Sequence, residues 1–161
     1  MFREMRRIRQ QAAREECEQI LRKAPRGVLA VLGDDDYPYA VPLDFAYEEG
    51  HIYFHCARAG HKLDAVRRHE KVSFCVLNEG EQEAGDWWYH FTSVIAFGRI
   101  REIAEPAEKD RCLRLIGGKY FPSADYLEDE MRSAPNAVIL DLRIDHMTGK
   151  IGRMVLEERQ K

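Results

Sequence analysis

The sequence predicts a mainly β domain whose antiparallel strands close into a small barrel, with helices at its flanks. First, 161 residues fit a single domain, 1–161, with a sizeable core. Second, apolar residues alternate with a period of two through residues 27–103 and again through 136–146. Third, polar turns separate these runs, as in hairpins. Six such strands would leave long apolar edges exposed unless the sheet closed on itself.

An amphipathic helix is expected over residues 1–24. Residues 3–23 contain no proline or glycine and space their apolar side chains at helical intervals, and Pro25 and Gly27 then end the pattern. Four arginines lie near its start: Arg3, Arg6, Arg7 and Arg9. We expect them to form a solvated or acid-paired helix face rather than a binding patch. The formal net charge of -3 gives no case for nucleic acid.

The barrel region, 27–103, divides into apolar runs joined by polar turns. These runs predict strands at 27–32, 39–47, 51–57, 71–78 and 88–102. A short helix is expected over 61–68. The acidic loop 79–86, which contains glycine, separates the last two strands.

The remaining third of the chain is expected to be helical and then to return to the barrel. Residues 105–133 predict a helical segment, whose first helix should close at Gly117 and Gly118. The alternating residues 136–146 predict a closing strand, and residues 147–161 a polar tail.

The first turn of the short helix carries positive charge. His61 and Lys62 follow Gly60, although a helix start already bears partial positive charge and free N–H groups and usually takes acidic residues. A bound phosphate would make these cations favourable. The alternative is that Lys62 reaches into water, and the local sequence leaves both readings open.

The strand before this helix has two chemically different faces. Alternation turns Ile52, Phe54 and Cys56 toward the core. His51, Tyr53 and His55 then face the other side. A phosphate at Lys62 is therefore expected to lie beside a pocket walled by Tyr53 and His55.

Pro42 is unusual inside a strand, because it removes a hydrogen-bond donor from the ladder. We expect it at a sheet edge, at a bulge or where something other than a strand docks. A planar ligand could lie along this backbone, with Asp44 as the only charge in the strand. The aromatic residues from Trp87 to Phe91 would cover such a ligand, or belong to the core or to a subunit contact.

Several other site classes lack their motifs. His55 and Cys56 are strand neighbours on opposite faces, and no paired ligand spacing is present, so no metal site is expected. Ser93 does not lie on a nucleophile turn, and no glycine-rich phosphate loop occurs. Four scattered cysteines, no signal peptide and no membrane-length apolar run indicate a reduced, cytoplasmic protein.

The order and spacing of five segments resemble a known family. The segments are 33–43, 53–57, 60–64, 93–99 and 146–150. They resemble the pyridoxamine 5'-phosphate oxidase-like flavin-binding split barrels, and within these the nitroimidazole-resistance (Nim) type. The resemblance implies a six-stranded antiparallel Greek-key split β-barrel, a homodimer, and FMN in a groove between the subunits.

The same resemblance implies roles for individual residues. The implied cofactor-binding positions are Val41, Pro42, Leu43, His55, Cys56, His61, Lys62 and Ser93. His61 and Lys62 would meet the FMN phosphate, and the segment 41–43 would run along the isoalloxazine. His55 would be the catalytic histidine near the flavin, and Ser93 would lie in the strand that closes the site.

The activity implied is that of an FMN-dependent oxidoreductase acting on a nitroaromatic or quinone-like acceptor. The alternatives are a deazaflavin- or haem-binding relative, and a non-catalytic module that holds a cofactor or metabolite. Vitamin B6 oxidation is disfavoured, because the arginine set with which the oxidase proper holds pyridoxamine phosphate is not recognisable here.

Overall fold

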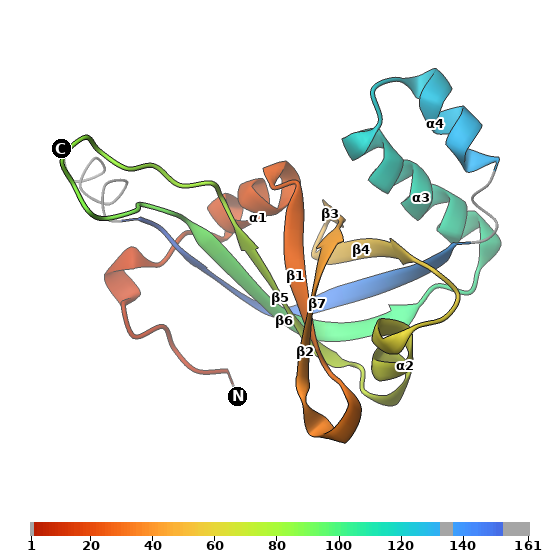
Figure 1. Cartoon of the computed structure of the whole chain (residues 1–161), viewed down its shortest axis with the longest axis horizontal. Coiled ribbons are helices and arrows are strands. Elements are labelled where there is room, and N and C mark those ends of the chain that lie inside the picture. Colours follow the sequence, from red (N-terminus) through yellow and green to blue (C-terminus); the bar gives the residue numbers. More distant parts are fainter. Residues whose placement is uncertain (1, 133–136, 153–161) are drawn as a thin grey trace.

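The computed structural model describes residues 2–132 and 137–152. Its centre is a seven-stranded sheet in the order β2-β1-β5-β6-β7-β4-β3. The strands are β1 Arg26–Leu32, β2 Pro38–Asp44, β3 Ala46–Glu48, β4 His51–Cys56, β5 Lys71–Leu77, β6 Ser93–Glu102 and β7 Val138–Lys150. All pairings are antiparallel, and the sheet curls so that β2 comes into contact with β4 (Figure 1). The mainly β split-barrel fold expected from the sequence is confirmed.

The described part of the chain has four α-helices beside the sheet. They are α1 Arg14–Lys23, α2 His61–Arg68, α3 Pro106–Tyr120 and α4 Ala124–Met131. Short 3-10 turns, η1 Ile8–Gln10 and η2 Asp34–Asp36, precede α1 and β2. None of the helices in the described ranges is long and apolar enough to cross a membrane.

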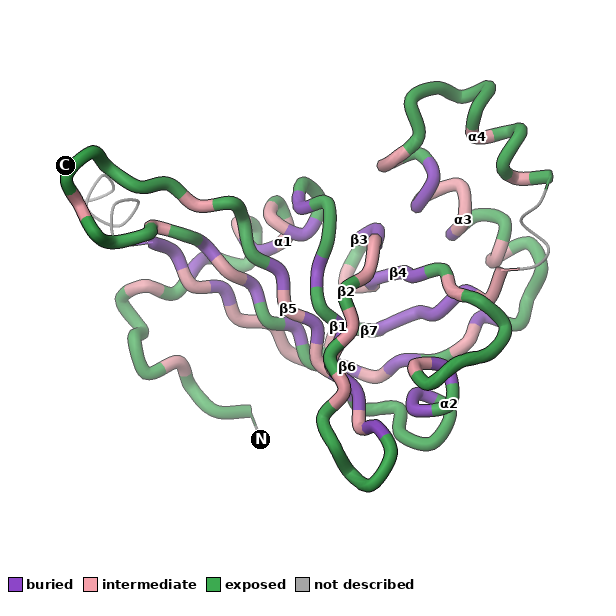
Figure 2. Tube along the Cα trace, viewed as in Figure 1, coloured by how far each residue is buried: buried purple, intermediate pink, exposed green. Residues whose placement is uncertain are grey.

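Two apolar clusters hold these layers together. The main core lies inside the curl, where α1 supplies Leu21, α2 supplies Leu63, and the rings of Phe45 and Phe54 meet Phe74 edge-on. A second cluster lies under α3, on the other face of β4 and β7 (Figure 2). The middle of β4 and the first residues of β7 are therefore buried on both faces.

The strand β7 joins the two halves of the sheet. It pairs with β6 from Ser93 to Glu102 and with β4 from His51 to Cys56. Its register shifts between Phe97 and Gly98 of β6. At Gly98 the two backbones approach so closely that a Cβ would collide with the carbonyl oxygen of Arg143.

Several expected element boundaries differ from the structure. The helix expected over 1–24 begins only at Arg14, because Gln11 pairs with Lys150 and the Ala12 N–H donates to the Gly149 carbonyl at 2.9 Å. These sheet contacts hold residues 10–12 in a non-helical path. The seventh strand arises because the expected strand 39–47 is divided at Phe45 into β2 and β3.

Later boundaries move as well. Gly117 does not end α3, which continues to Tyr120. The missing side chain of Gly117 instead makes room for Leu127 of α4. The strand expected over 88–102 begins at Ser93. The closing strand expected over 136–146 runs on to Lys150, so the first residues of the expected tail belong to the sheet. Residues 133–136 and 153–161 lie outside the described part.

Replacing Gly98 with alanine tests the close contact between β6 and β7. We expect Gly98→Ala to lower the free energy of unfolding by about 1–3 kcal/mol, because the added methyl must push two paired backbones apart. Gly118→Ala is the control, since a Cβ at this helical position meets nothing within 4 Å. It should stabilise the protein by up to about 1 kcal/mol. Urea denaturation measures both, and equal stability of Gly98→Ala and the parent would contradict the packing described.

Candidate functional site

The start of α2 exposes backbone donors. Gly60 has φ 131° and ψ 162°, a conformation essentially restricted to glycine. The N–H groups of Leu63 and Asp64 both donate to the Gly60 carbonyl, at 2.9 and 3.1 Å. The N–H groups of His61 and Lys62 belong to the first turn and have no partner within the helix. A Cβ at Gly60 would meet nothing within 4 Å, so this backbone is open to a ligand.

Lys62 adds a full positive charge to these donors. Its side chain is half-buried and forms no ion pair with any residue in the described ranges. The charge is close enough to Cys56 to act on that thiol. Burial, the largest effect, raises the pKa of Cys56, and Lys62 opposes this by stabilising the thiolate. Lys62 and the first-turn N–H groups together offer the donors that bind a phosphate.

The His61 side chain is engaged with the protein. Its ring stacks on Tyr39 at a centroid distance of 4.3 Å, and its Nε2 accepts a hydrogen bond from the Asp34 N–H at 3.3 Å. Asp34 also pairs with Arg68 at 2.7 Å, and that guanidinium holds the pKa of the Asp34 carboxyl below its usual value. These contacts tie both ends of α2 to the turn before β2. What His61 offers a ligand at the helix start is its backbone N–H.

The strand β2 lies beside α2 at one end of the sheet. Pro42 is paired in register with Val28 and is exposed, whereas Val41 and Leu43 are half-buried against the barrel core. No described strand pairs with the outer edge of β2, which is where a proline is tolerated. The three expected ring contacts therefore divide between two faces of one edge strand.

The prediction that Tyr53 walls a pocket is wrong. Tyr53 is buried beneath α3, and its hydroxyl accepts a hydrogen bond from Arg111 at 3.1 Å. Sequence alternation placed it on the outer face of β4 but did not show that a helix covers this face. Burial, the largest effect, raises the pKa of the Tyr53 hydroxyl, and the hydrogen bond from Arg111 partly lowers it.

His55 is exposed at the end of β4. It borders a recess of about 220 Å³ that is formed with Asp44 and with residues of α3 and α4, among them Ile116 and Tyr120. Cys56 follows His55, packs against the barrel core and lies near enough to Lys62 for that charge to act on its thiol. The structure therefore groups Cys56, His61 and Lys62, and places His55 next to this group on the helical side.

Ser93 is not brought to this group within one chain. It begins β6, whereas the far end of β6, Glu102, pairs with Arg67 of α2 at 2.6 Å. At 3.3 Å per residue these strand ends are about 30 Å apart. Only a second copy of the chain could bring a Ser93 near Lys62.

Sequence reasoning missed the apolar outer face of the sheet. Large side chains on this face are exposed, namely Val28, Leu77, Ile95 and Phe97. The signal was available, because the runs 74–77 and 94–97 are apolar on both faces instead of alternating with polar residues. Within the described ranges no three His, Cys, Asp or Glu side chains lie together as metal ligands would.

Comparisons with known proteins agree with this architecture. The sequence model of the family described as pyridoxamine 5'-phosphate oxidase matches residues 13–151. No curated protein matches the chain.

Solved structures of the same fold come from several bacteria. A candidate 5-nitroimidazole antibiotic resistance protein of Bacteroides thetaiotaomicron has 22% identity over 86% of this chain and 84% of its own, with a TM-score of 0.74. A FAD-binding protein of Mesorhizobium loti has 23% identity over 86% and 94% of the two chains, with a TM-score of 0.64. The flavocytochrome Anf3 of Azotobacter vinelandii has 21% identity over 91% of this chain and 71% of its own, with a TM-score of 0.74.

At these identities the structural likeness establishes the fold, and the family match spans most of the sequence, from the start of α1 to the end of β7. The curled antiparallel sheet and the order of its strands and helices are those of this group. The chain belongs to the pyridoxamine 5'-phosphate oxidase family.

Proposed function

We propose that this protein binds FMN at the start of α2 and along β2, and that it is a flavin-dependent oxidoreductase of the nitroimidazole-resistance type. The observation that carries the proposal is Lys62. It is a half-buried cation without an ion pair among the described residues, beside free first-turn N–H groups and an open glycine. Cations beside the positive end of a helix repel it, and a bound phosphate would make the electrostatic energy of this arrangement favourable.

The residues present suit an FMN phosphate and ring. Lys62 would pair with the phosphate, the N–H groups of His61 and Lys62 would donate to it, and Gly60 leaves room for its oxygens. Val41, Pro42 and Leu43 would border the isoalloxazine. Cys56 adds an apolar neighbour, since burial keeps its thiol protonated. The bound flavin would supply electron or hydride transfer, and the chain supplies anchoring and orientation.

The acceptor that we propose is a small planar molecule, such as a nitroaromatic or a quinone. His55 is exposed at the edge of this site and would donate a proton or a hydrogen bond to the acceptor. The names of the structural relatives, which include a candidate nitroimidazole-resistance protein and a FAD-binding protein, support a flavin and this acceptor class. A haem-binding alternative is kept, because another relative is a flavocytochrome.

We further propose that the protein is a homodimer with the FMN groove between its subunits. The exposed apolar residues of β1, β5 and β6 form one surface: Val28, Leu77, Ile95 and Phe97. Burying such a surface against a second copy is favourable. The separation of Ser93 from Lys62 in one chain supports a site that Ser93 of the partner subunit completes. The four free cysteines fit a reducing cytoplasm.

The absorption spectrum of the purified protein tests the cofactor directly. Flavin gives bands near roughly 370 and 450 nm, whereas haem gives a Soret band. A colourless protein that fails to bind added FMN would exclude the proposal, and a Soret band would favour the haem alternative.

Lys62→Gln should weaken FMN binding by about 1–3 kcal/mol, because one charge-assisted phosphate contact is lost. Quenching of flavin fluorescence measures the affinity. Riboflavin, which lacks the phosphate, should bind parent and variant alike. Lys71→Gln is the matched control, since Lys71 is an exposed cation at the start of β5. Equal FMN affinities for the Lys62 and Lys71 variants would contradict the phosphate contact and would mean that Lys62 is only a solvated surface residue.

His55→Ala should leave folding intact, because the side chain is exposed, and should slow reduction of a nitroaromatic or quinone by about 10²-fold if His55 donates the proton. FMN reduction and acceptor turnover are followed separately by stopped-flow absorbance. His69→Ala, which changes another exposed histidine just beyond α2, is the control. Unchanged turnover in His55→Ala would remove His55 from the mechanism.

Ile95→Asp should convert the dimer to a monomer, because it places a charge in the centre of the apolar face. Light scattering coupled to size exclusion measures the mass. Glu49→Lys, a charge change at the exposed β3–β4 turn, should leave the dimer intact. A parent protein that is monomeric at micromolar concentration, with or without FMN, would contradict the shared groove.

A further inference from the structure

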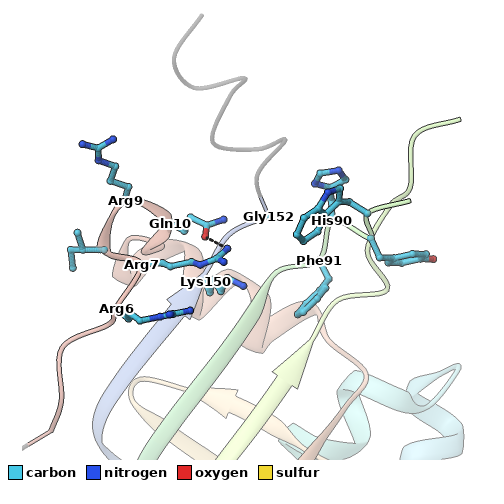
Figure 3. A pocket seen from close by; sticks show the side chains of 11 residues that line it. Arg6, Arg7, Arg9, Gln10, His90, Phe91, Lys150 and Gly152 are labelled. Carbon is cyan, nitrogen blue, oxygen red and sulfur yellow. Dashed lines mark hydrogen bonds between the residues drawn. The ribbon is translucent and has the colours of Figure 1, made fainter. Parts of the chain in front are cut away.

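Figure 3 shows a second cavity, larger than the recess at His55. It lies at the Ser93 end of β6, away from α2, which contacts the Glu102 end. Its volume is about 670 Å³, within the range of small-molecule sites. Its walls come from the N-terminal segment, the end of the 79–91 loop and the end of β7. The lining residues are Arg6, Arg7, Ile8, Arg9, Gln10, Trp88, Tyr89, His90, Phe91, Lys150 and Gly152.

Three cations face this cavity, and none of them is paired with an acidic side chain among residues 2–132 and 137–152. The side chains of Arg6, Arg7 and Lys150 point toward Phe91, whereas Arg9 points away (Figure 3). No aspartate or glutamate is among the described lining residues. The Arg7 guanidinium donates to the neutral Gln10 amide at 3.4 Å, and Arg6 forms no ion pair within the described ranges. Like charges held together in this way repel each other unless an anion joins them.

The opposite wall is aromatic. Trp88, Tyr89 and Phe91 are 48%, 57% and 40% exposed, so part of each side chain can contact a ligand, although the Trp88 ring also packs against Trp87 at a centroid distance of 4.2 Å. The Lys150 ammonium lies 5.8 Å from the centroid of Phe91, within reach of a cation–π contact. The cavity therefore combines flat apolar surfaces with concentrated positive charge.

The N-terminal segment that carries these arginines is anchored on both sides. Before the arginines, the Phe2 ring stacks on His146 at a centroid distance of 4.5 Å and lies 5.5 Å from Phe97. After them, the Ile151 N–H donates to the Gln10 carbonyl at 2.9 Å, and Gln11 pairs with Lys150. Both ends are thus fixed on the outer sheet, which places Arg6 and Arg7 at the cavity before any ligand arrives.

We infer that this cavity is a binding site for a planar aromatic anion, meaning a flat ring that carries a phosphate or carboxylate. The oxyanion pairs with Arg6, Arg7 and Lys150, and the ring lies against Phe91 and Trp88. The inference does not rest on the flavin assignment. Lys150 pairs with Ser93, at the end of β6 opposite to α2, so within one chain the cavity and Lys62 are about 30 Å apart. In the proposed homodimer the cavity would lie beside the Ser93 that completes the partner's FMN groove, so competition between FMN and the cavity ligand is measured directly.

Intrinsic fluorescence tests the inference without a label. The chain's two tryptophans are Trp87 and Trp88, and Trp88 lines the cavity. The full-length protein, with and without saturating FMN, is titrated with AMP, benzoate, adenosine and inorganic phosphate. We expect saturable quenching by AMP or benzoate, and affinity at least about ten-fold weaker for adenosine and for phosphate. Stronger binding of AMP identifies a nucleotide as the ligand, and stronger binding of benzoate an aromatic acid.

Charge-removing variants locate the response. Arg6→Gln and Lys150→Gln should each weaken binding about ten-fold. Arg3→Gln, which removes the same charge from the same segment outside the cavity, should bind as the parent does. No saturable quenching, equal affinity for AMP and adenosine, or equal losses in Arg3→Gln and Arg6→Gln would overturn the inference.

The role of FMN is separable in the same experiment. If FMN competes with AMP, and if Arg6→Gln loses FMN while Lys62→Gln retains it, then the cavity is the flavin site, which overturns this second site and the Lys62 assignment together. If Lys62→Gln alone loses FMN while AMP binding is unchanged, both sites stand. A parent protein that fails to bind FMN but binds AMP saturably, with the affinity for AMP weakened in Arg6→Gln and not in Arg3→Gln, would remove only the flavin proposal.

Discussion

The long strand β7 is the constraint on which the rest of the structure depends. It pairs with β6 along one edge and with β4 along the other, so it unites the two halves of the sheet. This double pairing needs the close backbone contact at Gly98, where the register shifts. The end of β4 then fixes where α2 begins, and the end of β7 fixes the N-terminal segment through Gln11. Both candidate binding sites are therefore positioned by one strand.

The parts of the fold that could be predicted are those encoded by local patterns. The period-two runs predicted the antiparallel sheet. Pro42 limited its strand to an edge, a bulge or a docking place, because a missing donor is tolerated only where no neighbour needs it, and the structure has β2 at the edge. Gly60 predicted where α2 begins, and the adjacent cations suggested an anion site there as a hypothesis, since charge at a helix end acts over one turn. These features need no knowledge of distant residues.

The parts that could not be predicted depend on contacts between residues far apart in sequence. Alternation gave the face of Tyr53 but not the helix α3 that covers it. It could not show that the His61 ring is held by Asp34 and Tyr39. Nor could helical spacing reveal that Gln11 pairs with β7, which is why the N-terminal arginines line a cavity instead of a helix face. The position of Ser93 could not be predicted either. Its distance from Lys62 depends on which end of β6 contacts α2, and this follows from how the strands pair.

The contacts around Asp34 have a thermodynamic consequence. This residue joins the turn before β2 to both ends of α2, through the His61 ring and through Arg68. The element that carries the expected phosphate contacts and the strand that carries the expected ring contacts are thus coupled through the protein itself. If the two segments moved independently, binding would have to order both and would cost conformational entropy of the protein. Much of that cost has already been met on folding. A ligand that bridges α2 and β2 therefore binds to one preorganised surface. Its affinity depends on the contacts of Asp34 with His61 and Arg68, which touch neither end of the ligand.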